Sequence, residues 1–335
     1  MAQKSAPMDS PQRIGNDSPD LEKVADSRGP QAGESHPPVT IDQLLVVAKT
    51  ALTPDPPDGA KEEFNTLIGR ALRESLAGQA QAEDYNILIH FDEGELIPAD
   101  ADKIYSGVKS FTDQKPLLLV LYSTGGNVNP AYLIGKLCRK YSNKKFIVVI
   151  PRLAKSAATL ICCAADEIHM GDLSELGPID PQIGDFPALG LKNAVEHLAG
   201  LTKEHPYASA MLADYLNRSL GNPLHLGYCE RVAESAVQYA VRLLEPHTST
   251  LGRAPEAIAN KLVYDYKDHG FAIDADEAKL IFGEEVIKVG TAIYQIGSNL
   301  YERLRIVSLI CDHHNHNFYH IGTLDAKPVI TRKRR

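Results

Sequence analysis

Three short, almost continuous runs of apolar residues constrain the fold of this chain more than any other feature. They are "YNILIHF" (85–91), "KPLLLVLYS" (115–123) and "KKFIVVI" (144–150), and segments with helical spacing at 98–112 and 129–141 separate them. Strands that are covered by helices on both faces have this composition, and strand–helix alternation implies parallel strands joined by right-handed crossovers. We therefore expect an α/β fold with a mostly parallel sheet.

The length and composition suggest one large α/β unit with appendages. The protein has 335 residues, of which 44% are hydrophobic and 23% are charged, so it can bury a sizeable core. Residues 1–40 are rich in Pro, Ser, Asp, Gly and Gln, and we expect a disordered N-terminal tail there. The remaining divisions are a helical lead-in (41–83), the α/β domain (84–290) and a helical C-terminal extension with a basic tail (291–335).

Net charge and cysteine content limit the partners and the compartment. The net charge of −8 disfavours binding to nucleic acid or to an anionic membrane, and the terminal "TRKRR" is read as a solvated tail. Five cysteines, two of them adjacent, are expected to be free thiols in a reducing compartment. No apolar run is long enough for a membrane span, and the N-terminus lacks a leader-like apolar region. We expect a cytoplasmic protein without stable membrane insertion.

Helices beside this core have clear patterns. A helix is expected from about Thr40 or Asp42, since either residue can cap its N-terminus. The segments 230–246 and 291–310 are amphipathic, which indicates packing in the core or against another subunit, and the second of them is a candidate contact between copies of the protein.

Unusual residues follow the second and third predicted strands. Ligands of parallel sheets bind beyond the carboxyl ends of the strands. "YSTGGNV" places Gly125 and Gly126 at one such end, where glycine amides could form an oxyanion hole or merely a tight turn. "PRLAKSAAT" places Ser156 at the next, where its hydroxyl could be a nucleophile or a helix N-cap. Side by side, a hydroxyl and free amides would form a minimal acyl-transfer site.

The order of these motifs resembles a known family. "STGGNV", "AKSAAT", "AADEIHM" and "LGPIDPQIG" follow one another as in the serine dehydrogenase proteinase family of Clp-fold serine peptidases, which are related to signal peptide peptidase A. The resemblance covers roughly 84–290 and implies a Clp/crotonase-like ββα spiral. It also implies that Ser156 is the nucleophile and that amides around Gly125, Gly126 and Ala157 form the oxyanion hole.

The base that would activate the serine is less clear from the sequence. "DHGFAIDADEAK" resembles the late histidine segment of the family, which makes His269 the preferred base, and Asp180 could orient it. The alternative is a Ser-Lys dyad like that of signal peptide peptidase A, with Lys203 as the better candidate and Lys192 as a weaker one. Lys155 is a poor candidate because adjacent side chains diverge, and it departs from the small or apolar residue expected before the serine.

The resulting prediction is a cytoplasmic serine endopeptidase that acts on a protein or peptide, needs no cofactor and forms a homo-oligomer, the last by resemblance alone. Two alternatives keep the fold: a crotonase-like acyl-CoA enzyme and a non-catalytic scaffold. The compact cluster "CDHHNHNFYH" (311–320) contains Cys and His, but it lacks the paired spacing of structural zinc sites, so no metal is predicted.

Overall fold

The computed structural model describes residues 37–183, 186–220 and 224–334. Pro38–Arg335 forms one compact unit. Most of the predicted disordered tail, residues 1–36, lies outside the described residues.

The helices and strands follow the expected alternation through the middle of the sequence. The helices are α1 (Ile41–Ala51), α2 (Ala60–Ser75), α3 (Pro98–Ser110), α4 (Val128–Tyr141), α5 (Ala157–Cys162), α6 (Ala188–Glu204), α7 (Ser209–Leu220), α8 (Leu224–Leu244), α9 (Pro255–Asn260), α10 (Ala275–Phe282) and α11 (Ala292–His313). The strands are β1 (Asn86–Asp92), β2 (Leu117–Ser123), β3 (Phe146–Ile150), β4 (Leu153–Ala154), β5 (Glu167–Met170), β6 (Glu175–Leu176), β7 (Gln182–Ile183), β8 (Phe186–Pro187), β9 (Ile287–Val289), β10 (His316–Thr323) and β11 (Val329–Arg332).

The main sheet is mostly parallel, which confirms the predicted fold class. Its strand order is β11-β10-β1-β2-β3-β5-β9, and the pairs from β1 to β9 are all parallel. Each new parallel strand adds beside the preceding one, so the crossover helices α3, α4 and α5 fall on the same face. The short strand β4 belongs to the same sheet but lies beside this series of strands, pairing with β2 and β6, and it brings the backbone to the carboxyl end of β2.

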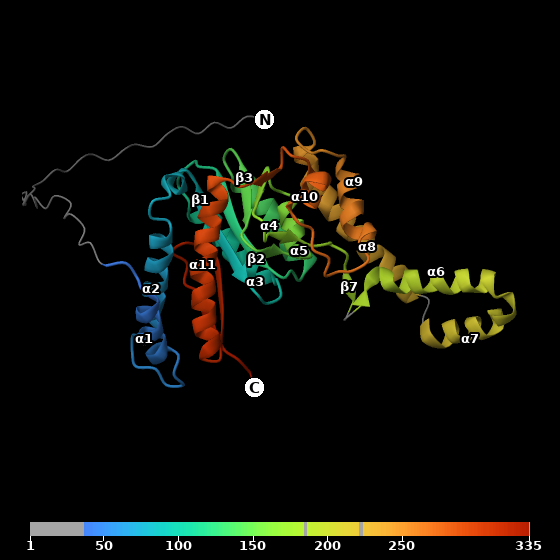
Figure 1. The fold of residues 1–335 in the computed structure, drawn as a ribbon, viewed down its shortest axis with the longest axis horizontal. Helices are drawn as coiled ribbons and strands as arrows, with labels where there is room; N and C mark the ends of the chain where they lie inside the picture. Colours follow the sequence, from blue (N-terminus) through green and yellow to red (C-terminus); the bar gives the residue numbers. More distant parts are fainter. Residues whose placement is uncertain (1–36, 184–185, 221–223, 335) are drawn as a thin grey trace, which may run out of the picture. The chain divides into compact units, whose positions relative to one another are not determined.

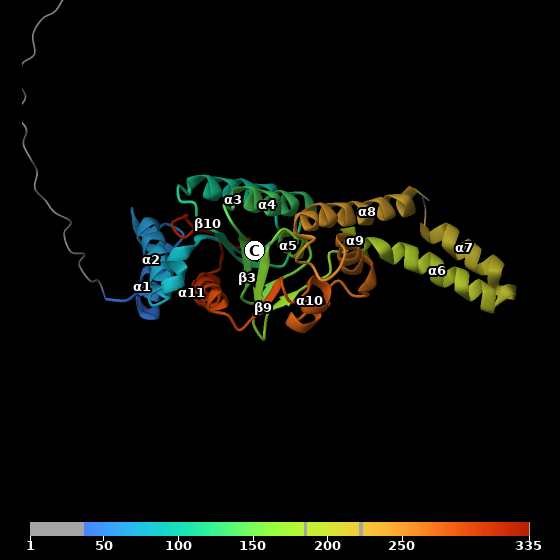
Figure 2. The same cartoon turned by 90° about the horizontal axis from the view of Figure 1, so that it is seen from above.

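Alternate residues of the strands enter two separate cores. Leu88, Leu119 and Val148 point toward α3, α4 and α5, whereas Ile89 and Val120 point toward α1, α2 and α11. The two sets of helices lie on opposite faces of the sheet (Figures 1 and 2). A sheet that is covered on both faces accounts for the unbroken apolar runs of its strands.

The segment that follows residue 290 completes this sheet. Helix α11 packs on the face of β2 and β3, and β10 pairs antiparallel with β1 at the edge of the sheet, with β11 outside it. The apolar side of α11, including Leu300, Leu304 and Val307, is buried in the second core. These three residues therefore pack within the protein, which is one of the two alternatives that the sequence suggested for 291–310, whereas Leu309 on the same helix is exposed.

The lead-in helix begins as its sequence predicts. Thr40 accepts a hydrogen bond from the Gln43 N–H, and the Gln43 side chain accepts one from the Thr40 N–H, which forms a capping box. Within the described residues, no helix combines the length and the apolarity that crossing a bilayer requires.

Candidate active site

Ser156 lies on a sharp turn between β4 and α5. Its backbone has φ 50° and ψ −122°, a conformation that residues other than glycine rarely adopt. Nucleophilic serines on strand-to-helix turns have this kind of strained backbone, which exposes the hydroxyl. The Ser156 side chain makes no capping hydrogen bond, and none of the described residues forms a hydrogen bond with its hydroxyl. The geometry therefore differs from that of an N-cap serine.

The glycine pair packs directly against this turn. Gly125 has φ 101°, and a Cβ atom at this position would lie 2.7 Å from the Cβ of Ser156. Gly126 has φ 142°, and a Cβ atom there would overlap the backbone nitrogen of Leu96. Both the dihedral angles and the close approach of other backbone require glycine here. The two predicted strand ends are therefore adjacent in space.

The hydrogen bonds of this segment distinguish the three predicted oxyanion donors. The Gly125 N–H donates to Ser123 Oγ at 3.1 Å. The Leu96 N–H donates to the Gly125 carbonyl at 2.8 Å, and the Leu96 carbonyl accepts from the Asn127 N–H at 2.9 Å. In this parallel pairing the Gly126 N–H points to the opposite side of its strand. Among the described residues, the N–H groups of Gly126 and Ala157 have no hydrogen-bond partner.

His269 and Asp180 form a short hydrogen bond although they are far apart in sequence. His269 Nδ1 lies 2.7 Å from Asp180 Oδ1, and the side chains are 30% and 8% exposed. Gln182 Nε2 donates to the other carboxylate oxygen, Asp180 Oδ2, at 2.8 Å. The Asp180 carboxylate is thus held on both oxygens, and it fixes the His269 ring through Nδ1. The other ring nitrogen, Nε2, is left for a different partner.

One cavity joins the serine and the histidine. Its volume is about 470 Å³, and its lining includes Ser156, His269, Gly126 and Ala157. The remaining lining residues are mostly apolar or uncharged: Thr124, Asn127, Val128, Leu160, Ile179, Pro181, Gln182, Val232, Ala236 and one acid, Glu95. The described residues around this cavity therefore provide the hydroxyls of Ser156 and Thr124, an imidazole, two unpaired main-chain amides and a single carboxylate.

The lysine candidates lie elsewhere. Lys203 is exposed near the end of α6, and Lys192 forms an ion pair with Glu230 at 3.6 Å; neither lines the cavity. Lys155 does not line the cavity either, and its Nζ forms an ion pair with Glu175 Oε2 at 2.7 Å. Of the three candidate bases suggested by the sequence, only His269 lies at the cavity that Ser156 lines.

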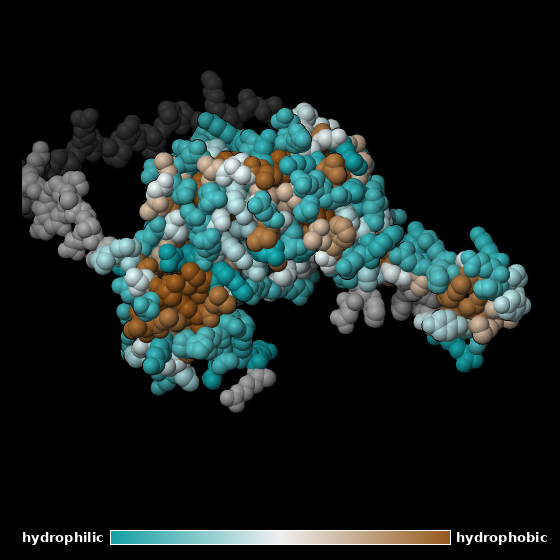
Figure 3. Space-filling model, viewed as in Figure 1, coloured by the Kyte–Doolittle hydropathy of each residue, from teal (hydrophilic) through white to brown (hydrophobic). Residues whose placement is uncertain are grey.

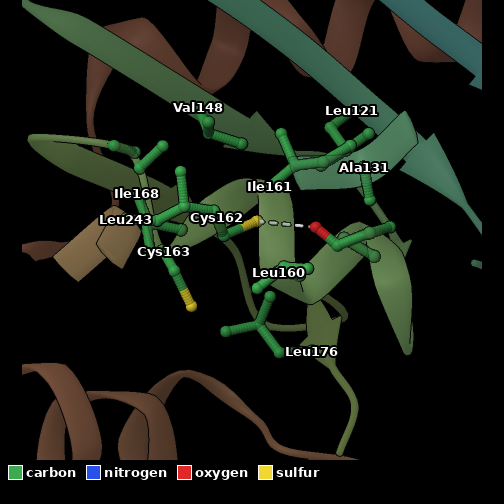
Figure 4. Close-up of a cluster of buried hydrophobic side chains, with 14 of the residues drawn as sticks. Leu121, Ala131, Val148, Leu160, Ile161, Cys162, Cys163, Ile168, Leu176 and Leu243 are labelled. Atoms are coloured by element: carbon green, nitrogen blue, oxygen red, sulfur yellow. Dashed lines mark hydrogen bonds between the residues drawn. The ribbon is translucent and has the colours of Figure 1, made fainter. Parts of the chain in front are cut away.

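All six residues of helix α5, which follows the serine, are buried. Leu160, Ile161 and Cys162 pack against β2, β3 and α4 in the first core, and Cys162 Sγ donates to the Ala158 carbonyl at 3.4 Å (Figure 4). Burial raises the pKa of Cys163 to about 12 and the pKa of Cys162 well above its ordinary value. These thiols are therefore protonated at neutral pH, and they are unsuited to act as nucleophiles in place of the serine.

The residues that support this site had few signals in the sequence. Gln182 contacts Asp180 from within the same short segment, and the only local signal was its place in "GPIDPQ". The position of Glu95 depends on the bridge between Leu96 and Gly126, which pairs segments that are separate in sequence.

In the cluster 311–320, Cys311 is buried in α11 and His320 Nε2 bonds to the Thr323 carbonyl. No group of three potential metal ligands is found in the part of the protein that the structure describes.

An accessible serine on a strained turn, a histidine–carboxylate pair and unpaired amides around one cavity define the class of serine hydrolases. Residues 96–215 match the model of a family described as ClpP-like SDH-type serine proteinase. The match confirms the resemblance seen in the sequence. It includes Gly125, Gly126, Ser156 and Asp180, whereas His269 lies outside it.

Two uncharacterized proteins of Methanocaldococcus jannaschii are similar to part of this protein. MJ0137 is 36% identical over 97 residues, which cover 29% of this chain and 34% of that protein. MJ1495 is 35% identical over 95 residues, which cover 28% of this chain and 32% of that protein. The similarity thus spans about a third of the length of these curated relatives.

Solved structures of a membrane-bound stomatin-specific protease, 1510-N, also align with this protein. One variant has 14% sequence identity and a TM-score of 0.38, and the alignment covers 72% of this chain and 89% of that one. A second variant, in complex with a substrate peptide, has the same identity and TM-score, and the alignment covers 74% and 86%.

Proposed function

We propose that this protein is a serine peptidase in which Ser156 attacks the scissile carbonyl. In this mechanism His269 Nε2 takes the hydroxyl proton while the Ser156 Oγ–carbon bond forms. The same proton then passes to the leaving amine as the carbon–nitrogen bond breaks. Water releases the acyl group by the reverse sequence, with His269 again as base. Asp180 holds the ring with Nδ1 protonated and stabilises the imidazolium.

The negative charge on the carbonyl oxygen would be stabilised by main-chain donors. The N–H groups of Gly126 and Ala157 are the donors that we propose, since both residues line the cavity and the described residues offer them no other acceptor. Removal of one such donor typically costs about 10²–10³ in rate. The Gly125 N–H, already bonded to Ser123, would act indirectly by holding the glycine turn in place.

The observation that carries this proposal is the 2.7 Å bond between His269 and Asp180 at the cavity that Ser156 lines. The triad order would be Ser156, Asp180, His269, which differs from the Ser-His-Asp order of Clp peptidases. Triads are defined by geometry rather than by sequence order, and several orders are known.

A fluorophosphonate probe tests the assignment. Wild type and Lys203→Ala should be labelled at equal rates, whereas Ser156→Ala should not be labelled and His269→Ala should be labelled much more slowly. A casein or fluorogenic peptide assay on the same four proteins should give the same order. Labelling that depends on Lys203 and not on His269 would replace the triad with a Ser-Lys dyad, and peptidase activity in Ser156→Ala would refute the proposal.

The two alternatives to peptide hydrolysis can be tested on the same variants. Acyl-CoA chemistry requires binding of an anionic cofactor, yet the only charged or titratable groups among the described lining residues are Glu95 and His269. Calorimetric titration with coenzyme A should show no binding, and binding would favour the crotonase-like alternative. A scaffold without catalysis would show neither probe labelling nor hydrolysis.

A cytoplasmic homo-oligomer is also part of the proposal. All five cysteines are free and buried, which suits a reducing compartment. Apolar residues gather on the surface over α1 and α11, where Ile41, Val46 and Leu309 are about half exposed or more (Figure 3). Monomers rarely leave a contiguous apolar patch uncovered. Light scattering should give a mass above that of one protomer, and Val46→Lys should lower it.

A further inference from the structure

Lys155, which directly precedes the proposed nucleophile, has an ammonium group that makes two hydrogen bonds and an ion pair. Lys155 Nζ donates to the Leu176 carbonyl at 3.2 Å and to the Phe271 carbonyl at 3.1 Å, and it lies 2.7 Å from Glu175 Oε2. Its side chain is only 17% exposed. Two of the three N–H groups of the ammonium are therefore hydrogen-bonded to backbone carbonyls, and its charge is paired with a carboxylate. Such a site differs from an ordinary surface ion pair, which has little fixed geometry.

One partner of Lys155, Phe271, belongs to the loop that carries the histidine, and the other two belong to β6. Phe271 follows His269 closely in the loop before α10, and Ile273 in the same loop pairs with Leu176 through two backbone hydrogen bonds, of 2.8 and 3.0 Å. The ammonium group therefore joins the turn of Ser156, strand β6 and the loop of His269.

The path of the lysine side chain depends on a glycine. A Cβ atom on Gly177 would lie 2.7 Å from Lys155 Cδ, so the absence of a side chain there lets the lysine stem pass. Lys155 also bonds through its backbone N–H to the Ser123 carbonyl at 3.0 Å, at the end of β2. Both ends of this residue are thus fixed, one to the sheet beside the glycine turn and the other to the histidine loop.

We propose that Lys155 is a positioning residue that sets the separation of Ser156 Oγ and His269 Nε2. This inference depends on the proposed peptidase function. The His269 ring is fixed by Asp180, and the backbone of its loop is fixed to the nucleophile turn by the ammonium group. Lys155 transfers no proton in this role. It acts on the reaction only through the placement of His269.

The test compares Lys155→Met, which keeps most of the unbranched stem but removes the donors and the charge, with Lys155→Arg, which keeps donors and charge. Proton transfer depends steeply on geometry, so Lys155→Met should lower kcat by about 10- to 100-fold with KM changed less than about twofold. Lys155→Arg should regain most of this loss. Lys145→Met is the matched control, because Lys145 pairs with Glu167 away from the cavity and its loss should leave kcat unchanged.

A double-mutant cycle separates positioning from a general loss of stability. If Lys155 acts through His269, then Lys155→Met in a His269→Ala background should cause no further loss of kcat. An equal fold loss in both backgrounds would overturn the inference, as would Lys155→Met with wild-type kcat. If Lys155→Met does not fold, Lys155→Gln is measured in the same cycle. A wild type without Ser156-dependent hydrolysis would refute the proposed function itself, so the two failures are distinguishable.

Discussion

Replacement of Asp180 by asparagine tests the histidine–carboxylate pair most sharply, because the structure predicts which way the new amide will turn. Gln182 Nε2 donates to Asp180 Oδ2, and His269 Nδ1 contacts Oδ1. In Asp180→Asn, the amide oxygen should keep the bond from Gln182, since the reverse orientation would set two donors against each other. The amide NH₂ then faces His269 Nδ1 and donates to it.

This orientation determines the size of the effect. If Nδ1 accepts a hydrogen bond, the proton of the neutral ring sits on Nε2, which then cannot take the serine proton. Loss of the charge alone would cost about 1.5–3 kcal/mol, or roughly 10- to 150-fold. The wrong tautomer costs about 10⁴-fold in kcat in serine proteases, which corresponds to about 5 kcal/mol. We therefore expect Asp180→Asn to lower kcat by about 10⁴-fold.

A second substitution should restore part of the activity. Gln182→Met removes the donor that orients the amide, so the asparagine can turn its oxygen toward Nδ1. The double variant Asp180→Asn with Gln182→Met should therefore lose only about 10²-fold in kcat relative to wild type, because the tautomer is corrected and only the charge is missing. Gln182→Met alone should stay within about threefold of wild type, since it leaves the Asp180 carboxylate and its bond to His269 in place.

The assay is peptide hydrolysis with kcat and KM measured separately across pH, alongside thermal unfolding of each variant. Asp172→Asn, at an exposed position away from the cavity, is the control and should behave as wild type. A loss of less than about tenfold in Asp180→Asn would refute the role of the carboxylate in holding the tautomer. A double variant no more active than Asp180→Asn would refute the predicted orientation of the amide.

Three further predictions concern the cavity and the fold. Gly126→Ala should destabilise the protein by about 2 kcal/mol or more because of its φ of 142° and its backbone contact, whereas Gly200→Ala, with open space around it, should be neutral or stabilising in the same thermal melts. Glu95→Lys should lower kcat/KM for peptides with a basic residue beside the scissile bond and raise it for peptides with an acidic one, by about tenfold at low salt. An unchanged preference would exclude contact between Glu95 and the substrate. Hydrogen bonding to His169 lowers the pKa of Glu167 from 4.5 to about 2. The ionised Glu167 carboxylate therefore stabilises the folded protein fully above about pH 4.5, and this contribution is lost as the pH falls toward 2. Glu167→Gln should flatten that part of the acid-denaturation curve.

The sequence by itself determined the parallel sheet and the elements next to the nucleophile. The three apolar runs became β1, β2 and β3 within a residue or two, because a strand covered on both faces needs apolar residues at nearly every position. The proximity of Gly125, Gly126 and Ser156 also followed from the sequence. Consecutive parallel strands end at one edge of the sheet, so residues that follow them must meet.

Only the tertiary structure decided what surrounds the serine. The bond between His269 and Asp180, the link from Lys155 to Phe271 and the position of α11 on the second face all join segments that are distant in the sequence. Local periodicity carries no information on such pairs. They depend on how the loops after β6 and before α10 close over the sheet, which is set by long-range packing and hydrogen bonding rather than by the properties of any one segment.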